Sequence, residues 1–587
     1  MKFCVLVVDF DGTIAVNDVL DRDVVSAIGE LRARGILVVL ATGRILQDLE
    51  RVAGNLHFVD AVVAENGGVV LFPESGYLTN SGPRPSPEFL RVLESEGIRH
   101  AAGRVLVDAD ANDAGRLLEV IRRLQLPLVL VFNRGRVMVM PQAISKATGV
   151  RSALAVLRLS PHNGVAIGDA ENDHELLQAC EVGVAVAWGS NALKAAADYV
   201  LPGEGPRAVS AYIRNLVNQI RLPIPMATRR SLVLGYRDDG QPLGLAIRGR
   251  NILVAGDPKS GKSWVTGLLC EQLILSGYSL CIIDPEGDYV SLEALPGVKA
   301  VGGADPLPRP RELIRSLRHA DTSLVIDLSH ASHEEKLAYV RTVLPALATL
   351  RRHTGLPHRI VLDEAHYFLH GRDGTALVDP EFGGYTIVSY RSSRLDPAVL
   401  ASSQAVIVTR ESHPAEVGAL HDLCTACPGG KTRSDWDALL GGLALGEAAV
   451  LPLTQEACGE IVRIRLAPRL TPHVRHQAKY IDIPIQESRE FVFWHDGLLT
   501  KQRARTLRDF VAIIERAPLS SLDGHLKRGD FSKWIAEVFG DYPLGKTVRE
   551  IEENYRRDAS GNAIPGIAMA IRARYEFLEQ AAPLLAS

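Results

Sequence analysis

Short runs of apolar, mostly β-branched residues recur along the chain as far as about residue 410. Each run is followed by a polar or glycine-containing turn and then by an amphipathic stretch. The clearest runs are Phe3–Val8, Ile36–Leu40, Val165–Ile167, Ile252–Ala255, Leu280–Ile283, Leu324–Asp327 and Arg359–Leu362. Continuous apolar strands that alternate with helices are typical of parallel sheets covered on both faces. The sequence therefore predicts an α/β protein.

The pattern changes at two places along the chain. Residues 221–247 contain three early prolines and a later Asp-Asp-Gly-Gln-Pro run, which predicts a linker followed by a hairpin. Beyond Gly441 we expect short strands at Ala448–Leu451 and Ile461–Leu466, and then a mainly helical tail punctuated by prolines. No internal repeat and no low-complexity tract is evident.

Length and charge limit the possible functions. A chain of 587 residues is too long for one hydrophobic core and suggests about four domains. The net charge of −4 gives no global cationic field, so any contact with nucleic acid needs a local basic patch. No apolar run approaches the roughly 20 residues of a membrane span. Seven thinly spread cysteines fit a reducing compartment, and we expect a cytoplasmic protein without membrane contact.

Carboxylates stand where the first apolar run ends. Asp9 and Asp11 are two residues apart at the carboxyl end of a predicted strand, the edge at which α/β sheets bind ligands. One carboxylate can attack phosphorus, while the other protonates the leaving oxygen and later activates water. These two residues predict a phosphoryl-transfer site.

Later strand ends carry residues that suit the same chemistry. Thr42 follows the second run and offers a hydroxyl to phosphoryl oxygens. Asp169 and Asp173 follow the third run and suit a hard, oxygen-liganded Mg²⁺ ion. Lys146 stands at a predicted helix start, where its charge could neutralise a transferred phosphoryl group.

These four motifs, in this order, resemble the haloacid dehalogenase superfamily of phosphatases over about residues 1–218. The resemblance implies a Rossmann-like core in which Asp9 is the nucleophile and Asp11 the acid/base. It places the hydroxyl of the second motif on Thr42 and the lysine of the third on Lys146. A phosphatase fold that has lost activity and serves as a scaffold is the alternative, although every catalytic position is filled.

The resemblance also implies a metal site and a cap. Mg²⁺ would be held by Asp9, Asp11, Asp169 and Asp173. The Glu65-Asn66-Gly67-Gly68 segment and an insert at about residues 82–140 are similar to the Cof-type subgroup, in which an α/β cap at this place selects the substrate. This cap is short for the subgroup, so we expect a small phosphoester as substrate.

A phosphate-binding loop follows the Ile252–Ala255 run. The sequence Gly-Asp-Pro-Lys-Ser-Gly-Lys-Ser lies between a predicted strand and a predicted helix, Trp264–Leu275, which is the context that such a loop requires. Its glycines let backbone N–H groups face the β-phosphate, and its lysine reaches the β- and γ-oxygens. The expected ATP-binding residues are Gly256, Lys259, Ser260, Gly261, Lys262, Ser263 and Asp363.

Two acidic residues after the Arg359–Leu362 run complete this second site. Asp363 suits the Walker-B position near Mg²⁺, which Ser263 would also ligate. Glu364 suits the polarisation of the attacking water. A phosphate-binding loop and such an acidic pair together predict ATP binding and hydrolysis.

The order of motifs resembles the HerA/FtsK-type motor ATPases over about residues 228–470. The strand after the loop ends in Asp284-Pro285-Glu286-Gly287-Asp288-Tyr289, similar to a motif of that family. The resemblance implies a RecA-like parallel sheet, with Gln404 as a polar sensor and Arg410 or Arg394 as an arginine that reaches a neighbouring subunit's nucleotide. The arginines could equally be surface ion-pair partners. Family members usually work as hexameric rings, so a homo-oligomer is implied.

The chain departs from that family at its start. HerA proteins carry a β-barrel before the ATPase core, whereas here a phosphatase precedes it and only the stretch from Leu232 to Ile247 could stand in for the barrel. DNA translocation is therefore in doubt, while nucleotide binding is not.

Three smaller signals favour structural roles. His421, Cys424 and Cys427 could begin a zinc site, but a second ligand pair is missing and buried thiols are the favoured interpretation. Basic runs at residues 471–480 and 501–505 could hold phosphate backbones, but solvated faces or interdomain salt bridges are the favoured interpretation. A His…Asp-Phe-x-x-Trp-Ile pattern at residues 525–535 is similar to uncharacterised bacterial domains and favours packing or partner binding.

The predicted organisation has three parts joined by a linker. The phosphatase core occupies residues 1–81 and 141–218, its cap 82–140, a linker and hairpin 219–250, the ATPase 251–485 and a small helical C-terminal module 486–587. Three hypotheses follow: an ATP-gated phosphatase for a small phosphorylated substrate, a DNA-translocating or end-processing machine, and an ATP-switched assembly scaffold. The acidic isoelectric point favours the first.

Overall fold

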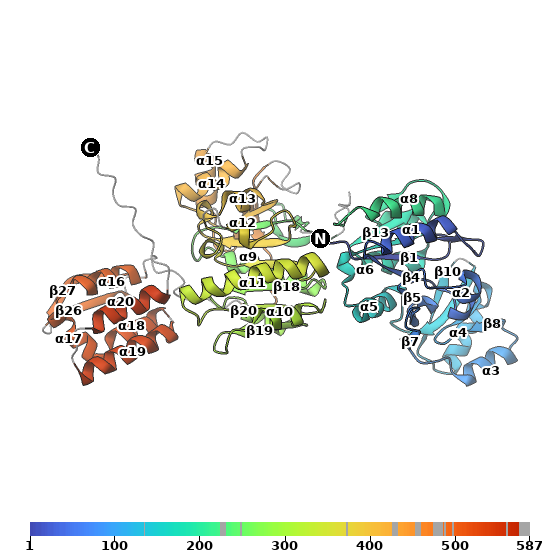
Figure 1. The fold of residues 1–587 in the computed structure, drawn as a ribbon, viewed down its shortest axis with the longest axis horizontal. Coiled ribbons are helices and arrows are strands. Elements are labelled where there is room, and N and C mark those ends of the chain that lie inside the picture. Colours follow the sequence, from blue (N-terminus) through green and yellow to red (C-terminus); the bar gives the residue numbers. More distant parts are fainter. Residues whose placement is uncertain are drawn as a thin grey trace. The chain divides into compact units, whose positions relative to one another are not determined.

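The computed structural model divides into two compact units, the first formed mainly by residues 1–231 and the second by most of the remaining chain (Figure 1). The structure describes residues 1–133, 135–222, 230–246, 249–370, 374–424, 433–451, 453, 460–472, 485, 489–495, 498–539, 541–558 and 562–574. None of the helices in these ranges combines the length and the apolar character that crossing a membrane would need.

The first unit is built on an eight-stranded sheet with the order β14-β13-β12-β1-β4-β5-β6-β7. The strands are β1 (Val5–Asp9), β4 (Leu37–Ala41), β5 (Ala61–Ala64), β6 (Val69–Phe72), β7 (Tyr77–Asn80), β12 (Gly164–Gly168), β13 (Val182–Val186) and β14 (Tyr199–Leu201). All pairs from β14 to β5 are parallel, and β6 and β7 add an antiparallel edge. The expected parallel sheet is therefore confirmed.

Helices cover both faces of this sheet. They are α1 (Arg22–Arg32), α2 (Leu46–Ala53), α5 (Lys146–Val156), α6 (His174–Ala179), α7 (Asn191–Ala196) and α8 (Gly205–Val217). Successive side chains of a strand point to opposite faces. In β1, Leu6 and Val8 accordingly pack with α1 and α8, whereas Val5 and Val7 pack with α5 and α6. Burial on both faces explains why the strands read as continuous apolar runs.

A cap interrupts the first unit between β7 and α5. It contains a four-stranded antiparallel sheet with the order β10-β11-β9-β8 and two helices. These elements are α3 (Pro87–Ser95), β8 (His100–Ala102), β9 (Val107–Asp110), α4 (Ala114–Arg123), β10 (Leu128–Asn133) and β11 (Arg136–Pro141). The two helices pack on one face of the sheet around a separate apolar core. A short hairpin, β2 (Ala15–Val16) and β3 (Val19–Leu20), follows β1.

The second unit contains an eleven-stranded sheet with the order β16-β15-β25-β24-β23-β17-β22-β21-β18-β20-β19. Its strands are β15 (Leu232–Tyr236), β16 (Pro242–Leu245), β17 (Ile252–Ala255), β18 (Leu280–Asp284), β19 (Val298–Gly302), β20 (Ser323–Asp327), β21 (Arg359–Leu362), β22 (Tyr385–Ser389), β23 (Ala405–Val408), β24 (Glu447–Val450) and β25 (Val462–Leu466). Strands from β23 to β19 are parallel, and the other four are antiparallel. The expected hairpin forms, and it pairs with β25 at the edge of this sheet.

Helices of varied length connect these strands. They are α9 (Lys262–Leu275), α10 (Pro310–Leu317), α11 (His333–Thr354), α12 (Gly374–Leu377), α13 (Pro397–Ala401), α14 (Pro414–Cys424) and α15 (Arg433–Gly441). The apolar helix α9 follows β17 directly, as the sequence predicts.

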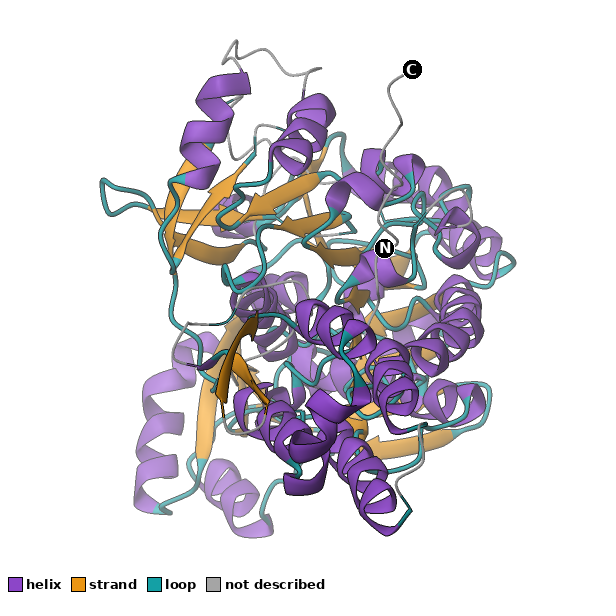
Figure 2. Cartoon of the chain, turned by 90° about the vertical axis from the view of Figure 1, so that its left-hand side faces the viewer, coloured by secondary structure: helices purple, strands orange, loops and turns teal. Residues whose placement is uncertain are grey.

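Over its described residues the C-terminal module combines a hairpin with five helices, so helices predominate there (Figure 1). Figure 2 colours the helices and strands of the whole chain separately. Its elements are β26 (Phe491–His495), β27 (Leu498–Ala504), α16 (Leu507–Arg516), α17 (Leu519–Arg528), α18 (Asp530–Phe539), α19 (Tyr542–Arg557) and α20 (Ala563–Arg574). Aromatic rings of Phe491, Phe510 and Trp534 pack on one another with centroids 5.0–5.4 Å apart. The tail therefore has its own core.

Candidate active sites

Three neighbouring strands bring the first set of predicted residues together. β1 lies between β4 and β12, and all three run in the same direction. Asp9 ends β1, Thr42 follows β4, and Asp169 follows β12. Because carboxyl ends of parallel strands meet at one edge of a sheet, these side chains share a site.

Lys146 is fixed at this edge by the start of α5. Ser145 caps the helix: its hydroxyl accepts from the backbone N–H of Thr148, and the Thr148 hydroxyl accepts from that of Ser145. The Lys146 ammonium, 2% exposed, donates to Asp9 Oδ1 and Asp173 Oδ1 at 2.6 Å each. The helix start thus places the lysine between two buried carboxylates.

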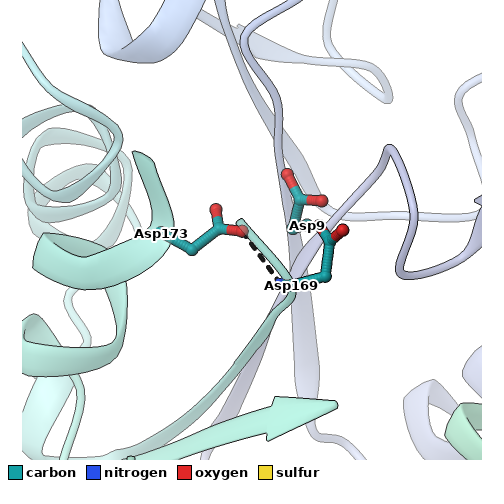
Figure 3. Close-up of side chains that lie close together, drawn as sticks. All are labelled: Asp9, Asp169 and Asp173. Carbon is teal, nitrogen blue, oxygen red and sulfur yellow. Dashed lines mark hydrogen bonds between the residues drawn. The ribbon is translucent and has the colours of Figure 1, made fainter. Parts of the chain in front are cut away.

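Asp9, Asp169 and Asp173 form a buried acidic triad, with one oxygen of each within 4.8 Å of the others (Figure 3). Asp173 Oδ2 also accepts from the backbone N–H groups of Asp169 and Ala170, at 3.1 Å each. Burial and the Asp173 carboxylate raise the pKa of Asp9, against the opposing effect of Lys146. One ammonium among three buried carboxylates leaves excess negative charge, which a hard cation such as Mg²⁺ would offset.

Asp11 lies apart from the acidic triad. Its side chain is 36% exposed, and it is not among the carboxylates that cluster as possible ligands within the described residues. Instead, Arg44 donates to both of its oxygens, with Nη2 to Oδ1 at 2.6 Å and Nε to Oδ2 at 2.9 Å. A role for Asp11 in holding the metal therefore stays a prediction. The partly exposed position of Asp11 is compatible with its expected role as the acid/base group.

Arg44 is a residue to which sequence reasoning gave no role, although it follows Thr42 and Gly43 directly. Its guanidinium also pairs with Asp18 and, at 2.8 Å, with Asp48. The hydrogen bonds to Asp11 raise the pKa of Arg44 further above its usual range. Its backbone N–H donates to the Thr42 hydroxyl at 3.1 Å, which orients that side chain.

The site opens into a cavity of about 540 Å³ that core and cap line together. Core residues at its wall include Asp9, Asp11 and Lys146, and cap residues include Asn133 and Arg136. Arg136, half exposed, pairs with Asp108 on the neighbouring cap strand, with Nε to Oδ2 at 3.0 Å. This cavity can hold a small anion whose phosphoryl group reaches Asp9.

A second site lies at the carboxyl end of β17. Gly256 and Gly261 have φ angles of 146° and 112°, which residues with a side chain rarely adopt. A Cβ atom on Gly256 would lie 2.1 Å from Thr409 Oγ1, so only glycine fits there. The Lys262 ammonium donates to the carbonyl oxygens of Gly256 and Asp257, at 3.0 and 2.9 Å. Lys259 and Ser260 complete the loop, and α9 begins at Lys262.

Acidic side chains at the carboxyl ends of two further strands, β21 and β18, belong to the same site. Asp363 and Glu364 follow β21, which β22 separates from β17, and both are buried. Ser263 Oγ donates to Asp288 Oδ2 at 2.6 Å. Asp284 accepts backbone hydrogen bonds from residues 286–289, and burial with nearby Asp288 raises its pKa. Sequence reasoning quoted Asp288 within a motif but gave it no role.

The part of the chain that carries the first site is similar to known proteins. Residues 6–86 and 86–213 match the family of haloacid dehalogenase-like hydrolases. The phosphoglycolate phosphatase of Methanosarcina acetivorans is 33% identical over 223 residues, which cover 36% of this chain and 96% of that protein. The chain belongs to the haloacid dehalogenase-like hydrolases. The phosphoglycolate phosphatase of Methanopyrus kandleri is 29% identical over 232 residues, covering 37% of this chain and 97% of that protein.

A second family model matches another part of the chain. Residues 249–355 match the central domain of helicase HerA. The chain is thus a haloacid dehalogenase-like phosphatase domain fused to a HerA-like ATPase domain. A solved haloacid dehalogenase-like hydrolase from Bacteroides thetaiotaomicron is 20% identical, covers 37% of this chain and all of that chain, and has a TM-score of 0.33.

The position of Gln404 in this hydrolase contradicts its predicted role as a sensor. Gln404 precedes β23, whose first residue pairs with Ile252 at the amino end of β17. It therefore lies at the opposite end of these strands from the phosphate-binding loop, and its Oε1 accepts from the Asn251 N–H at 3.2 Å. Thr409 follows β23 and Ser389 ends β22, so both lie at the carboxyl ends of their strands, and Thr409 Oγ1 lies 2.5 Å from Ser260 Oγ of the loop.

The two candidate arginines are both exposed. Arg410 lies beside the loop of its own chain, with Nε 3.6 Å from Asp257 Oδ2. Arg394 ends the short 3-10 helix Ser392–Arg394 that follows β22. A role toward a neighbouring subunit stays a prediction for both.

The smaller sequence signals have structural explanations. His421 and Cys424 lie in α14, where Cys424 is buried, while Cys427 and residues 473–480 lie outside the described residues. Arg503 pairs with Glu490 at 3.1 Å, as an ordinary surface ion pair would. The imidazole of His525 links the Asp530 carboxylate to the backbone N–H of Trp494, which explains the C-terminal motif as packing.

Proposed function

We propose that the N-terminal domain is a Mg²⁺-dependent phosphomonoesterase that works through an aspartyl-phosphate on Asp9. The observation that carries the proposal is the bridge from Lys146 to Asp9 and Asp173, 2.6 Å on each side, at the carboxyl edge of the sheet. Such a bridge needs a helix start and two strand ends to converge. A scaffold without catalysis would not require a buried lysine among three buried carboxylates.

The chain's own residues supply both steps of this reaction. An oxygen of Asp9 attacks phosphorus, the bond from phosphorus to the ester oxygen breaks, and Asp11 gives that oxygen a proton. Water then attacks the phosphorus, its proton passes to Asp11, and the bond to Asp9 breaks. Lys146 and the Thr42 hydroxyl hold the phosphoryl oxygens in place. Mg²⁺, for which Asp9, Asp169 and Asp173 form a suitable donor set, would supply positive charge against the phosphoryl group.

We infer that the substrate is a small phosphoester with a second anionic group, such as phosphoglycolate. Two related proteins bear the name phosphoglycolate phosphatase, with almost their full length aligned. The cavity of about 540 Å³ is lined by Arg51 and Arg136. Each has five N–H donors, of which the pairing with Asp48 or Asp108 uses only a part, so each can also meet a substrate carboxylate.

Phosphate release from phosphoglycolate tests this proposal. We expect turnover that needs Mg²⁺, stops on chelation, and falls at least about 10³-fold in Asp9→Asn, because the amide is not a nucleophile. Glu74→Gln, an exposed change in the same domain, is the control and should keep full activity. Turnover that survives Asp9→Asn would refute the proposed nucleophile.

We further propose that the HerA-like domain binds and hydrolyses ATP, with Lys262 on the phosphates and Asp363 and Glu364 near the metal and the attacking water. The shape of the loop at Gly256 and Gly261 and the buried acidic pair support this. A homo-oligomer, such as a ring, belongs to the same proposal. ATP hydrolysis should be lost in Lys262→Ala, and hydrolysis retained by that variant would overturn the assignment.

A further inference from the structure

A buried carboxylate outside the catalytic set joins the core of the phosphatase domain to its cap. Glu65 directly follows β5, and its side chain is fully buried. Its oxygens accept hydrogen bonds from the backbone N–H groups of Arg104, Val105 and Leu106 at 2.9, 2.7 and 3.3 Å. These three residues belong to the cap, between β8 and β9. An ionised carboxylate only accepts, and its hydrogen bonds to N–H groups are about twice as strong as neutral ones.

The backbone on both sides is shaped to allow this contact. Glu65 and Asn66 have φ angles of 53° and 51°, a left-handed conformation that is uncommon for residues with a side chain. On the cap side, a Cβ atom on Gly103 would lie 2.6 Å from Glu65 Oε2. A Cβ atom on Gly68 would lie 2.8 Å from the Cβ of Val105. Neither glycine leaves room for a side chain, so the segment 103–106 packs closely against the core.

Apolar contacts support the cap in the same position. Leu106, Met138 and Met140 form a small buried cluster, against which Ile45 and Ile144 pack. Met138 and Met140 lie on β11, and this strand begins with Arg136, which lines the catalytic cavity. The position of the segment 103–106 therefore affects where Asn133 and Arg136 of the cap lie in the cavity that contains Asp9.

We propose that Glu65 is a positioning residue that fixes the cap over the catalytic site and thereby sets which organic group the phosphatase accepts. The inference rests on the phosphatase activity proposed above and deepens it. The phosphoryl group meets residues of the core, whereas the rest of the substrate meets Asn133 and Arg136 of the cap. Loosening the contact at Glu65 therefore weakens recognition of the organic group and leaves the reaction at phosphorus intact.

Glu65→Gln tests this separation. Glutamine keeps the size of the side chain but turns one acceptor into an NH₂ donor that faces the N–H groups of the cap. We expect the KM for phosphoglycolate to rise about 10- to 100-fold, as small misplacements of positioning groups do. The Mg²⁺-dependent exchange of ¹⁸O between water and inorganic phosphate, which needs Asp9 but no organic group, should stay close to wild type. Amide hydrogen exchange at residues 104–106 should become faster.

A second variant approaches the same contact from the cap. Gly103→Ala adds a methyl group against the Glu65 carboxylate, and we expect the same rise in KM. Combined with Glu65→Gln, the two changes should be far from additive, because they disturb one contact. Glu74→Gln, an exposed glutamate between β6 and β7, is the matched control and should change none of these values.

The possible outcomes separate the two proposals. A wild-type protein that neither hydrolyses phosphoglycolate nor exchanges phosphate oxygen would refute the phosphatase, and substrate selection with it. An active wild type with an unchanged KM in both Glu65→Gln and Gly103→Ala would refute the role of Glu65 alone. A loss of phosphate oxygen exchange equal to the loss with phosphoglycolate would also refute it, because the core would then be damaged.

Discussion

At the residue scale, the phosphatase site depends on one buried ammonium. Lys146 is the cation that bridges Asp9 and Asp173, and both carboxylates are almost fully buried. In Lys146→Met we expect turnover to fall about 10²–10³-fold, because a charge aimed at the phosphoryl group is removed. Removing one partner of a buried ion pair also costs about 3–5 kcal/mol of folding free energy. We therefore expect a lower thermal unfolding midpoint in a chelator, largely recovered on adding Mg²⁺, measured by calorimetry beside phosphate release.

Lys194→Met is a suitable comparison for that variant. Lys194 lies in α7 of the same domain and donates to the carbonyl oxygen of Ala187 at 3.2 Å. Its loss should leave turnover and the response to Mg²⁺ unchanged. If Lys146→Met kept wild-type turnover, the lysine would hold the fold rather than the phosphoryl group.

Candidate residues that end or follow an apolar run could be named from the sequence, whereas contacts that depend on the cap or on the hairpin after β1 could not. Asp9, Thr42 and Asp169 each end or follow an apolar run, and parallel strands gather such residues at one edge. Arg44 meets Asp11, 33 residues away, and Glu65 meets a cap segment about 40 residues away. No local pattern specifies those pairs, because they depend on where the cap and the short hairpin after β1 lie.

At the element scale, α5 must lie close to the sheet for its first residue to reach Asp9. A Cβ atom on Gly149, one turn after Lys146, would lie 2.5 Å from Val63 Cγ1 and 2.6 Å from the Cα of Gly67. We expect Gly149→Ala to push the helix away, to cost about 1–3 kcal/mol of stability and to lower turnover at least about tenfold. Thermal unfolding and phosphate release measure the two effects.

Gly29→Ala in α1 is the matched control, because it makes the same substitution where space is available. Apart from its chain neighbours and the backbone of α1 itself, no atom lies within 4 Å of a Cβ built on Gly29, so alanine should stabilise α1 by about 0.5–1 kcal/mol. Full activity in Gly149→Ala would mean that the helix is not held against the sheet as closely as the structure indicates.

The strands themselves were predictable as elements, since β17 and β21 match their apolar runs residue for residue. The prediction of Gln404 as a sensor was wrong because it ignored the direction of β23 relative to the site. A residue before a parallel strand lies at its amino end, whereas phosphate-binding loops lie at carboxyl ends. The hairpin of β15 and β16 was predictable from its turn, but its partner β25 begins more than 200 residues later in the chain.

At the scale of the whole molecule, the two proposed phosphate-handling sites stand on separate sheets, and we expect one substitution to switch off each of them. Asp9→Asn removes the proposed nucleophile of the first, and Lys262→Ala removes the phosphate-binding lysine of the second. ATP hydrolysis measured in the Asp9→Asn background therefore belongs to the HerA-like domain alone. The double variant with Lys262→Ala gives the blank.

We expect this ATP turnover to be the same with and without double-stranded DNA. The net charge of −4 gives no general attraction to phosphates, and the hairpin of β15 and β16 extends the ATPase sheet. Rates measured at low and at physiological salt make the test sharper, because binding to DNA weakens steeply as salt rises. Strong stimulation at low salt that disappears with Lys262→Ala would instead establish a nucleic-acid motor, and the phosphatase would then act on the ends of its track. If ATP turnover is indifferent to DNA, the ATPase acts together with the phosphatase on the same chain. ATP should then change the rate of phosphoglycolate hydrolysis in the wild-type protein but not in Lys262→Ala.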